Sequence, residues 1–268
     1  MSEIFLGVKD PNIFSYSRFY HFWKKRTLLS KLFAQEAKRS KESIKVLDVG
    51  CGNGVDLFCI NSIYNDFQKS IFVGLDLSEE NIRSCNNAKD EKNIPNINFL
   101  VGDIESMSFK EGTFDVVICS EVLEHLPNQT HVVMKIRRIL KDGGALIITT
   151  PNKSNSFLKI ARFFRFLGLW KHKSEGKMKQ GIPPFSEGFG HISTRSLSEL
   201  IDIFSKAKFK IESIKRGAPI AGSVYYDSLS FLFATLVIID ILFDCLPFTN
   251  NFTETVIMKL RKPCTTTI

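Results

Sequence analysis

Hydrophobic and polar positions alternate along the chain in a pattern that predicts a parallel sheet with crossover helices. Short apolar runs with the length of buried strands are separated by stretches in which apolar residues recur at helical spacing. The predicted strands are 44–49, 70–76, 97–103, 114–120, 144–150, 208–216 and 253–261. Because strands that alternate with helices form βαβ units, the pattern indicates an α/β fold.

The predicted helices carry recognisable start and stop signals. They cover roughly 54–65, a segment beginning at the cap Ser78, roughly 129–140, and a segment from Thr194 or Ser196 to about Ala207. Glu79 and Glu80 follow the Ser78 cap, where the helix dipole favours acidic side chains. A turn is expected at Asp142-Gly143-Gly144.

Net charge and cysteine use narrow the class of protein. The formal charge is +8, and the stretch 153–179 holds eight Lys or Arg against the single acid Glu175, so the rest of the chain is close to neutral. A general nucleic-acid-binding surface is therefore not indicated. The six cysteines form no CxxC pair and no zinc spacing with histidine, so we expect most to be small buried hydrophobes in a reducing compartment.

No targeting or membrane-spanning segment is expected. The first residues lack a basic region followed by an apolar run, as a signal peptide would have. The longest uncharged apolar run, 229–239, is shorter than the roughly 20 residues that a spanning helix needs. We expect a cytoplasmic protein.

The strongest chemical signal is a glycine loop preceded by an acid. Asp48, Gly50, Gly52 and Gly54 follow directly on a buried strand and precede a helix. Glycines allow positive φ and close approach of the backbone to a ligand. In the NAD fingerprint the third glycine comes three residues after the second, whereas here it comes two residues after. An acid at this place repels a pyrophosphate and suits a ligand with an ammonium or sulfonium group.

Two further acids end the next two predicted strands. Asp76 ends the second strand and can accept hydrogen bonds from both ribose hydroxyls. Asp103 ends the third and can bind an adenine amino group while Ile104 stacks on the ring. All three acids fall at carboxyl ends of parallel strands, where open α/β sheets bind ligands.

These motifs resemble those of class I S-adenosylmethionine-dependent methyltransferases, in the branch with ubiquinone-biosynthesis O-methyltransferases and other small-molecule methyltransferases. The resembling segments are VLDVGCGNG, GLDLS, GDIESMSFKEGTFDVVICSEVLEHL and ILKDGGALIITTPN. The resemblance implies a Rossmann-like sheet of seven strands in the order 3-2-1-4-5-7-6, mostly parallel with the last strand antiparallel. The cofactor that it implies is S-adenosylmethionine, with S-adenosylhomocysteine as the product.

The resemblance also assigns residues to the parts of the cofactor. Asp48 and the loop Gly50, Cys51, Gly52 and Gly54 are expected to hold the methionine end. Asp76, with Leu77 beside it, is expected at the ribose, and Asp103 and Ile104 at the adenine. Cys119 and Ser120, at the end of the fourth strand, are expected to line the centre that donates the methyl group.

The same reasoning divides the chain into a core and added segments. A Rossmann-like core, 44–150, continues in 194–216 and in the last strand and tail, 253–268. The additions are an N-terminal helical cap, 1–43, a basic lid insertion, 151–193, and an apolar helical insertion, 217–252.

Two histidines are candidates for the catalytic base, and both also have a structural interpretation. His125 follows the fourth strand, beside the expected methyl position, and imidazole titrates near neutrality. It acts as a base or packs against the cofactor. His191 lies near the expected substrate mouth and acts as a base or makes a structural hydrogen bond at a helix start. His21, His131 and His172 are expected to lie on the surface or on helix faces. No metal site is expected.

The added segments point to an apolar methyl acceptor. Residues 155–173 combine Lys and Arg at helical spacing with a wide apolar face, and 217–252 is more apolar still. They are expected to form a lid over the pocket, and a basic amphipathic helix also suits peripheral contact with anionic lipid. We therefore expect a small hydrophobic or lipid-like acceptor, methylated at oxygen.

Three other functions share some of these features. A nucleic-acid or protein methyltransferase would also use basic charge, but the residues after the fourth strand, Ser120-Glu121-Val122-Leu123, are not the Asn/Asp-Pro-Pro-aromatic loop of adenine- and glutamine-methylating enzymes. A non-catalytic scaffold that still binds the cofactor is a second alternative. A nicotinamide oxidoreductase is disfavoured by the glycine spacing and by Asp48.

Overall fold

The computed structural model describes residues 16–40, 43–63, 69–155, 192–218, 230–246, 249 and 253–264. Its strands are β1 Lys45–Val49, β2 Ile71–Asp76, β3 Ile97–Val101, β4 Phe114–Ser120, β5 Leu140–Pro151, β6 Lys210–Arg216 and β7 Thr255–Arg261. Its helices are α2 Tyr16–Arg39, α3 Val55–Ile63, α4 Glu79–Glu91, α5 Gln129–Ile139, α7 Leu197–Lys206 and α9 Ser230–Asp244, with a short 3-10 helix η3 Leu123–His125.

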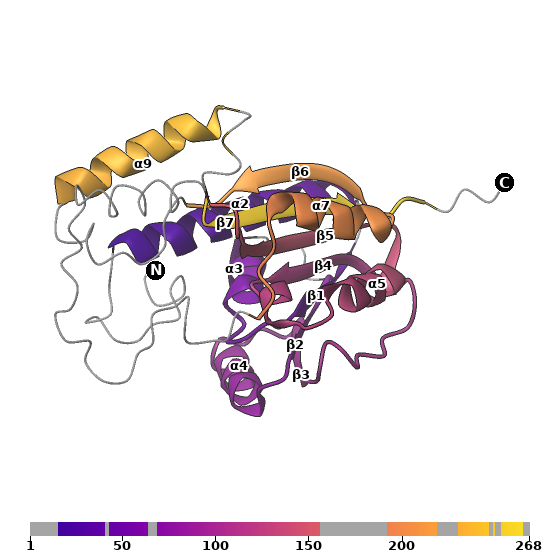
Figure 1. Cartoon of the computed structure of the whole chain (residues 1–268). Helices are drawn as coiled ribbons and strands as arrows, with labels where there is room; N and C mark the ends of the chain where they lie inside the picture. Colours follow the sequence, from indigo (N-terminus) through magenta and orange to yellow (C-terminus); the bar gives the residue numbers. More distant parts are fainter. Residues whose placement is uncertain are drawn as a thin grey trace.

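The strands form one sheet in the order β3-β2-β1-β4-β5-β7-β6. β1 pairs in parallel with β2 and β4, and β4 with β5, whereas β7 is antiparallel to both β5 and β6. The predicted order and the antiparallel last strand are both confirmed. Figure 1 shows the sheet with helices on both of its faces.

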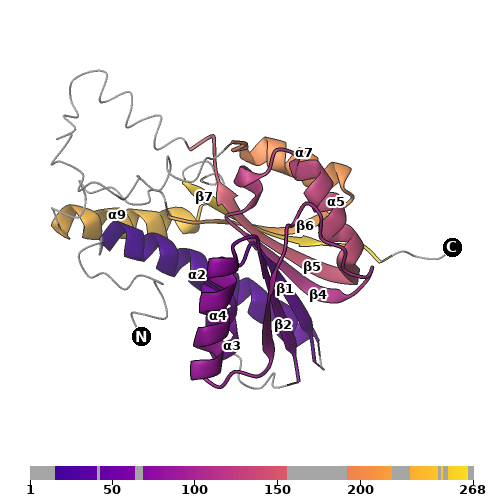
Figure 2. The same cartoon turned by 90° about the horizontal axis from the view of Figure 1, so that it is seen from below.

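Each face of the sheet has its own hydrophobic core. One core contains side chains of α2, α3 and α4, and the other contains side chains of α5 and α7 (Figure 2). Neighbouring residues of one strand point to opposite cores, as Val46 and Leu47 of β1 do. Because both faces are covered, the central strands are apolar throughout rather than alternating.

Helix starts follow the predicted capping chemistry. The Ser78 hydroxyl accepts a hydrogen bond from the Asn81 amide at the start of α4. Ser196, rather than Thr194, caps α7, where Ser196 and Glu199 form a reciprocal capping box. These contacts satisfy backbone donors that the first helical turn leaves unpaired.

The expected turn at 142–144 is a bulged part of β5. That strand begins at Leu140, which pairs with Phe114, and the register shifts before Ala145 pairs with Val116. Gly143 takes up the irregularity with a φ of +74°. The strand continues through it because the backbone of Gly143 and Gly144 hydrogen-bonds with Lys262 beyond the end of β7.

Helix α2 is fixed to the sheet by a buried group of charges. Glu36 accepts hydrogen bonds from Lys259, at 3.0 Å, and from Arg261, at 2.5 and 2.7 Å. Glu212 of β6 binds the same two cations. Although burial alone would raise it, the pKa of Glu36 is lowered by the hydrogen bonds from Arg261 and Lys259. Two acids therefore balance two buried cations.

None of the described helices is long and apolar enough to cross a membrane. All six cysteines lie in the described part of the chain, and none is in a disulfide. Cys51, Cys59, Cys85 and Cys119 are buried as expected, whereas Cys245 and Cys264 are exposed.

The Glu36 contacts predict a large loss of stability when they are cut. Glu36→Ala leaves Lys259 and Arg261 buried with Glu212 as their remaining acid, so the free energy of unfolding should fall by about 2 to 3 kcal/mol in urea titrations. Asp202→Ala is the control, because it breaks an exposed pair with Lys206 and should cost less than about 1 kcal/mol. Equal losses in the two variants would show that the buried group does not hold α2.

Candidate cofactor site

The carboxyl ends of β1, β2 and β4 lie next to one another and form the candidate site. β1 is the middle strand of the three, and the helices that follow β1 and β4 pack on opposite faces of the sheet. This arrangement makes the end of β1 a topological switch point, where open α/β sheets bind ligands. The loop Gly50–Gly54 begins there.

The glycine loop is packed at both ends and open in the middle. Gly50, Gly52 and Gly54 all have positive φ, of +71°, +52° and +72°. A Cβ on Gly50 would lie 2.4 Å from Val122, and one on Gly54 would lie 2.9 Å from Phe99. A Cβ on Gly52 would have no neighbour within 4 Å. The loop therefore needs glycine to fold, and it leaves space for a ligand at Gly52.

Asp48 is a buried acid with an unpaired oxygen. It is 1% exposed, and its Oδ1 has no hydrogen-bond partner in the described structure. Burial raises the pKa of Asp48 well above its ordinary value, and the nearby Asp56 adds to the effect. A buried unpaired carboxylate is costly, and a bound ammonium group would remove that cost.

Asp76 joins β2 to the glycine loop. Its Oδ2 accepts a hydrogen bond of 2.7 Å from the Gly52 amide. Its Oδ1 accepts from the Ser78 amide and the Asn81 side chain, at 2.9 and 3.3 Å. Each carboxylate oxygen can accept more than one hydrogen bond, so these contacts are compatible with ribose hydroxyls.

Helix α2 brings cations to this edge, which the sequence did not indicate. The Nζ of Lys25, a buried residue, lies 3.4 Å from the Ser120 hydroxyl at the end of β4. Arg26 Nε lies 3.3 Å from Asp56 in the first turn of α3. Although burial would raise it, the pKa of Asp56 is lowered by the charges of Lys25 and Arg26. The sequence signal was only a Lys-Lys-Arg run, which is common on solvated helices.

Two polar atoms on the same helix have no partner. His21 lies on helix α2, and of the two expected places, the surface or a helix face, it occupies a buried helix face with 6% exposure. Neither Nδ1 of His21 nor Nη1 of Arg26 has a hydrogen-bond partner in the described part of the chain. Burial, with the charges of Lys25 and Arg26, lowers the pKa of His21 to about 3. The imidazole is therefore neutral beside two cations.

A pair of acids after β4 is a second feature that the sequence analysis missed. Glu121 has a φ of +56° and accepts a hydrogen bond of 2.7 Å from Thr149. Glu124 is fully buried and accepts one of 3.0 Å from Thr150, while its Oε1 has no partner in the described structure. Burial, followed by the charge of Glu121, raises the pKa of Glu124 to about 8.

A family model described as a methyltransferase domain matches residues 40–192, more than half of the chain. The chain belongs to the class I S-adenosylmethionine-dependent methyltransferases. Their cofactor, S-adenosylmethionine, fits the edge described above: its ammonium matches the unpaired Asp48, and its carboxylate matches the cations of α2.

Two curated relatives and one solved structure illustrate how far the likeness extends. A ubiquinone biosynthesis O-methyltransferase of Coxiella burnetii is 32% identical over 109 residues, which are 41% of this chain and 44% of that protein. A phthiotriol/phenolphthiotriol dimycocerosates methyltransferase of Mycobacterium ulcerans is 30% identical over 111 residues, 41% of this chain and 39% of that protein. The chain thus spans less than half the length of these relatives.

The solved structure is a magnesium protoporphyrin IX methyltransferase from Synechocystis with bound S-adenosylhomocysteine. It has a TM-score of 0.56 and 14% identity, and the match covers 92% of this chain and 85% of that one. The likeness is one of fold.

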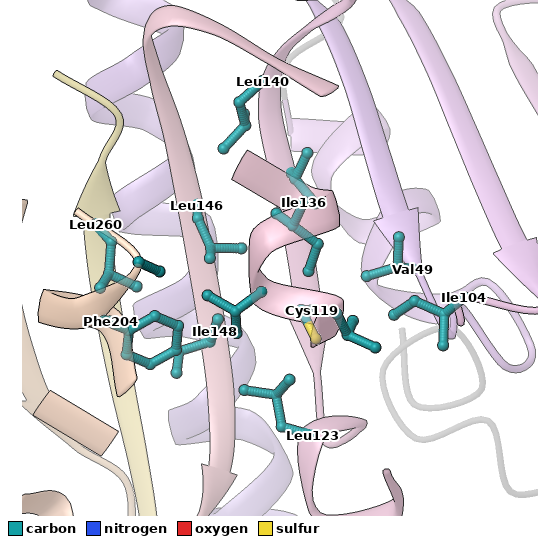
Figure 3. Packing of buried hydrophobic residues seen from close by; sticks show 14 of the residues in the cluster. Val49, Ile104, Cys119, Leu123, Ile136, Leu140, Leu146, Ile148, Phe204 and Leu260 are labelled. Carbon is teal, nitrogen blue, oxygen red and sulfur yellow. The ribbon is translucent and has the colours of Figure 1, made fainter. Parts of the chain in front are cut away.

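In this methyltransferase, the side chains of two residues predicted to bind the cofactor pack in the core. Cys119 is fully buried, and Figure 3 shows it among Val49, Leu123 and Ile148. The side chain of this β4 residue faces the α5 side of the sheet, and the expectation that Cys119 lines the methyl-donating centre stays a prediction. Ile104 also packs in this core near Val49 (Figure 3). Leu77, by contrast, is 73% exposed at the same edge.

The remaining predicted positions lie at or just beyond the carboxyl ends of the strands. Asp103 accepts a hydrogen bond of 2.8 Å from the Glu105 amide. Cys51 is buried in the glycine loop, and its amide donates to the Leu75 carbonyl. Ser120 lies 3.1 Å from Thr149, in contact with Lys25 on its other side. Their roles toward the cofactor stay predictions.

Residues 192 and 193 are hydrogen-bonded to η3, the short helix that contains His125. His125 is the last residue of η3 and is partly buried. His191, like the basic segment that precedes it, lies outside the described residues, as does His172. The next two residues, Ile192 and Ser193, donate their amides to the Glu124 carbonyl of η3, at 3.1 and 3.0 Å.

The glycine loop predicts a specific loss of cofactor binding. Gly50→Ala adds a Cβ against Val122 at a positive φ, so S-adenosylhomocysteine should no longer raise the melting temperature. Gly112→Ala is the matched control: its φ is +61°, and its Cβ would meet nothing within 4 Å. It should cost about 1 to 2 kcal/mol of stability and keep the ligand response. A normal response in Gly50→Ala would contradict the packing described here.

The raised pKa of Glu124 predicts how stability depends on pH. The folded protein holds a proton on Glu124 up to about pH 8, whereas the unfolded chain releases it near 4.5. Folding therefore binds a proton in this interval, and stability falls as pH rises through it. Glu124→Gln removes this loss and should be the more stable protein above about pH 8, by on the order of a few kcal/mol.

Urea titrations at several pH values test this dependence. Glu79→Gln removes an exposed carboxylate and serves as the control, which should follow the wild-type curve. Parallel curves for wild type and Glu124→Gln would contradict a proton held on Glu124.

Proposed function

We propose that the protein transfers the methyl group of S-adenosylmethionine to an oxygen of a small, hydrophobic or lipid-like acceptor. Binding of the cofactor is supported by two unpaired polar atoms near the carboxyl ends of the strands, one an acceptor and the other a donor. Asp48 Oδ1 offers an acceptor, and Arg26 Nη1 offers a donor close to Lys25. A zwitterionic amino-acid group would satisfy both.

The proposed roles follow from position. Asp48 binds the ammonium of the cofactor, while Lys25 and Arg26 bind its carboxylate, which also relieves their crowding with His21. Asp76, with the exposed Leu77 beside it, holds the ribose hydroxyls, and Asp103 with Ile104 next to it binds the adenine. The open space at Gly52 allows the backbone to approach the ligand.

Methyl transfer needs alignment more than covalent help from the protein. The bound cofactor supplies a methyl group on a positively charged sulfur, which is a good leaving group. The protein holds the acceptor in line and takes up the proton that a hydroxyl loses. His125 and His191 are the proposed proton acceptors, whereas Glu124 still holds its own proton near neutral pH and cannot take up another there.

The apolar acceptor is supported by the added segments and by the relatives. The basic segment 155–173 and the helix α9 are rich in apolar residues. The names of the two curated relatives refer to ubiquinone and to phthiotriol dimycocerosates, which are both lipid-like. We propose in addition that 155–173, which lies almost wholly outside the described residues, makes peripheral contact with a membrane.

Methyl-labelled S-adenosylmethionine, incubated with the protein and lipid or quinone extracts, tests the proposal. Mass spectrometry should find label in an apolar product. Asp76→Ala should abolish both the label and the thermal shift with S-adenosylhomocysteine, because the ribose loses its partner. His125→Ala should keep the shift and lose at least about tenfold in rate if His125 is the base.

Each other outcome counts against a particular part of the proposal. Label in polar metabolites alone would contradict the apolar acceptor, and label in nucleic acid or protein would favour that alternative. Tight S-adenosylhomocysteine binding without any label, across lipid, polar and macromolecular fractions, would favour a non-catalytic scaffold.

A further inference from the structure

Both acids of helix α9 are paired with cations of α2 and β6, although Asp240 is buried and the Asp244 side chain is 39% exposed. Asp240 is fully buried and binds Lys24 Nζ at 2.5 Å and the Tyr20 hydroxyl at 2.8 Å. It also pairs with Arg216 at the end of β6, which contacts Asp244 at 3.4 Å. Lys24 reaches Asp244 as well, at 2.8 Å. The two acids of the helix are therefore matched by two buried cations.

The outward face of α9 is apolar. In its described part, four large aliphatic side chains are at least 40% exposed: Ile238, Ile239, Ile241 and Leu242. Ile238 lies one helical turn from Ile241 and Leu242, so these three share a face, and Leu246, just beyond the end of the helix, is 40% exposed as well. A surface helix in water normally shows the opposite polarity, with charges outward and apolar residues inward.

Helix α9 lies at the same end of the sheet as the candidate site. Figures 1 and 2 both show α9 alongside α2, on the side of the sheet to which the carboxyl ends of β4 and β5 point. On α2, Trp23 is 43% exposed and stacks on Tyr20, which binds Asp240. Tryptophan is enriched at the boundary between lipid and water.

We propose that the outward face of α9, with Trp23 beside it, is a contact surface for an anionic lipid bilayer. Its 15 residues are about 22 Å long, too short to span a bilayer, so the helix lies in the plane of the surface. The proposal deepens the proposed function, because it gives a lipid-like acceptor a short path from membrane to site.

Charge favours lipid over a second protein as the occupant. The inward ion pairs leave the face without a net negative charge that would repel anionic head groups. The chain has a net charge of +8, and the segment that follows Asn152 contributes most of it. Anionic lipid attracts such basic segments within about one Debye length of the surface.

Vesicle flotation of the full-length protein tests this surface. Wild type should float with vesicles that contain phosphatidylglycerol in phosphatidylcholine, and less with phosphatidylcholine alone. The double variant Ile238→Glu, Leu242→Glu should lower the ratio of bound to free protein by at least about tenfold, since it removes two apolar anchors and adds two repelled charges. The double variant Leu100→Glu, Met134→Glu is matched in chemistry and lies on β3 and α5, and it should bind as wild type does.

Three results would overturn the proposal. One is equal flotation of the α9 variant and wild type. The second is a wild-type dimer that the α9 substitutions convert to a monomer, with flotation unchanged, which would make the face a contact between copies. The third is a melting temperature several degrees lower with unchanged flotation, which would show that the protein covers the face itself. The thermal shift with S-adenosylhomocysteine is recorded in parallel, and its absence in wild type would count against the proposed function and not against the lipid surface.

Discussion

Buried ion pairs at two points along α2 decide which of its side chains face the sheet. Glu36 binds Lys259 and Arg261 of β7 near the end of the helix, and Lys24 binds Asp240 of α9 near its start. Between these two anchors, Lys25 and Arg26 reach the carboxyl edge. Buried charges tolerate little displacement because each needs its partner at close range. The position of α2 is therefore fixed by partners more than 200 residues away along the chain.

The candidate site has charges that the protein alone does not balance. Asp48 and Glu124 have unpaired oxygens, and their pKa values are raised because burial disfavours their charged forms. His21 shows the converse, a pKa lowered by burial and by neighbouring cations. Raised and lowered pKa values that occur close together are typical of functional sites. A ligand with separated positive and negative ends reduces both kinds of strain, which a pyrophosphate would not do beside Asp48.

The strand pattern and the acid-glycine loop made the core predictable from the sequence. Both signals are local: a buried strand, a positive-φ glycine and a capping serine are each determined within a few residues. Contacts between distant segments could not be predicted in this way. The Lys-Lys-Arg run of α2 does not reveal that Lys25 faces Ser120, since helical spacing gives only relative directions. The core position of Cys119 was hidden for another reason, because β4 is apolar on both faces and shows no alternation.

The two neighbouring lysines of α2 connect the surface of the molecule with its site. Lys24 binds the acids of α9, and Lys25, the next residue, lies at Ser120 beside Asp48. Successive residues on a helix point about 100° apart, so one backbone position determines both contacts. Because Asp240 and Asp244 of α9 pair with Lys24 and Arg216, this side of the helix faces α2 and β6, and its exposed aliphatic residues lie on the other side. Anchoring of α2 and the apolar surface of α9 are thus two consequences of the same ion pairs.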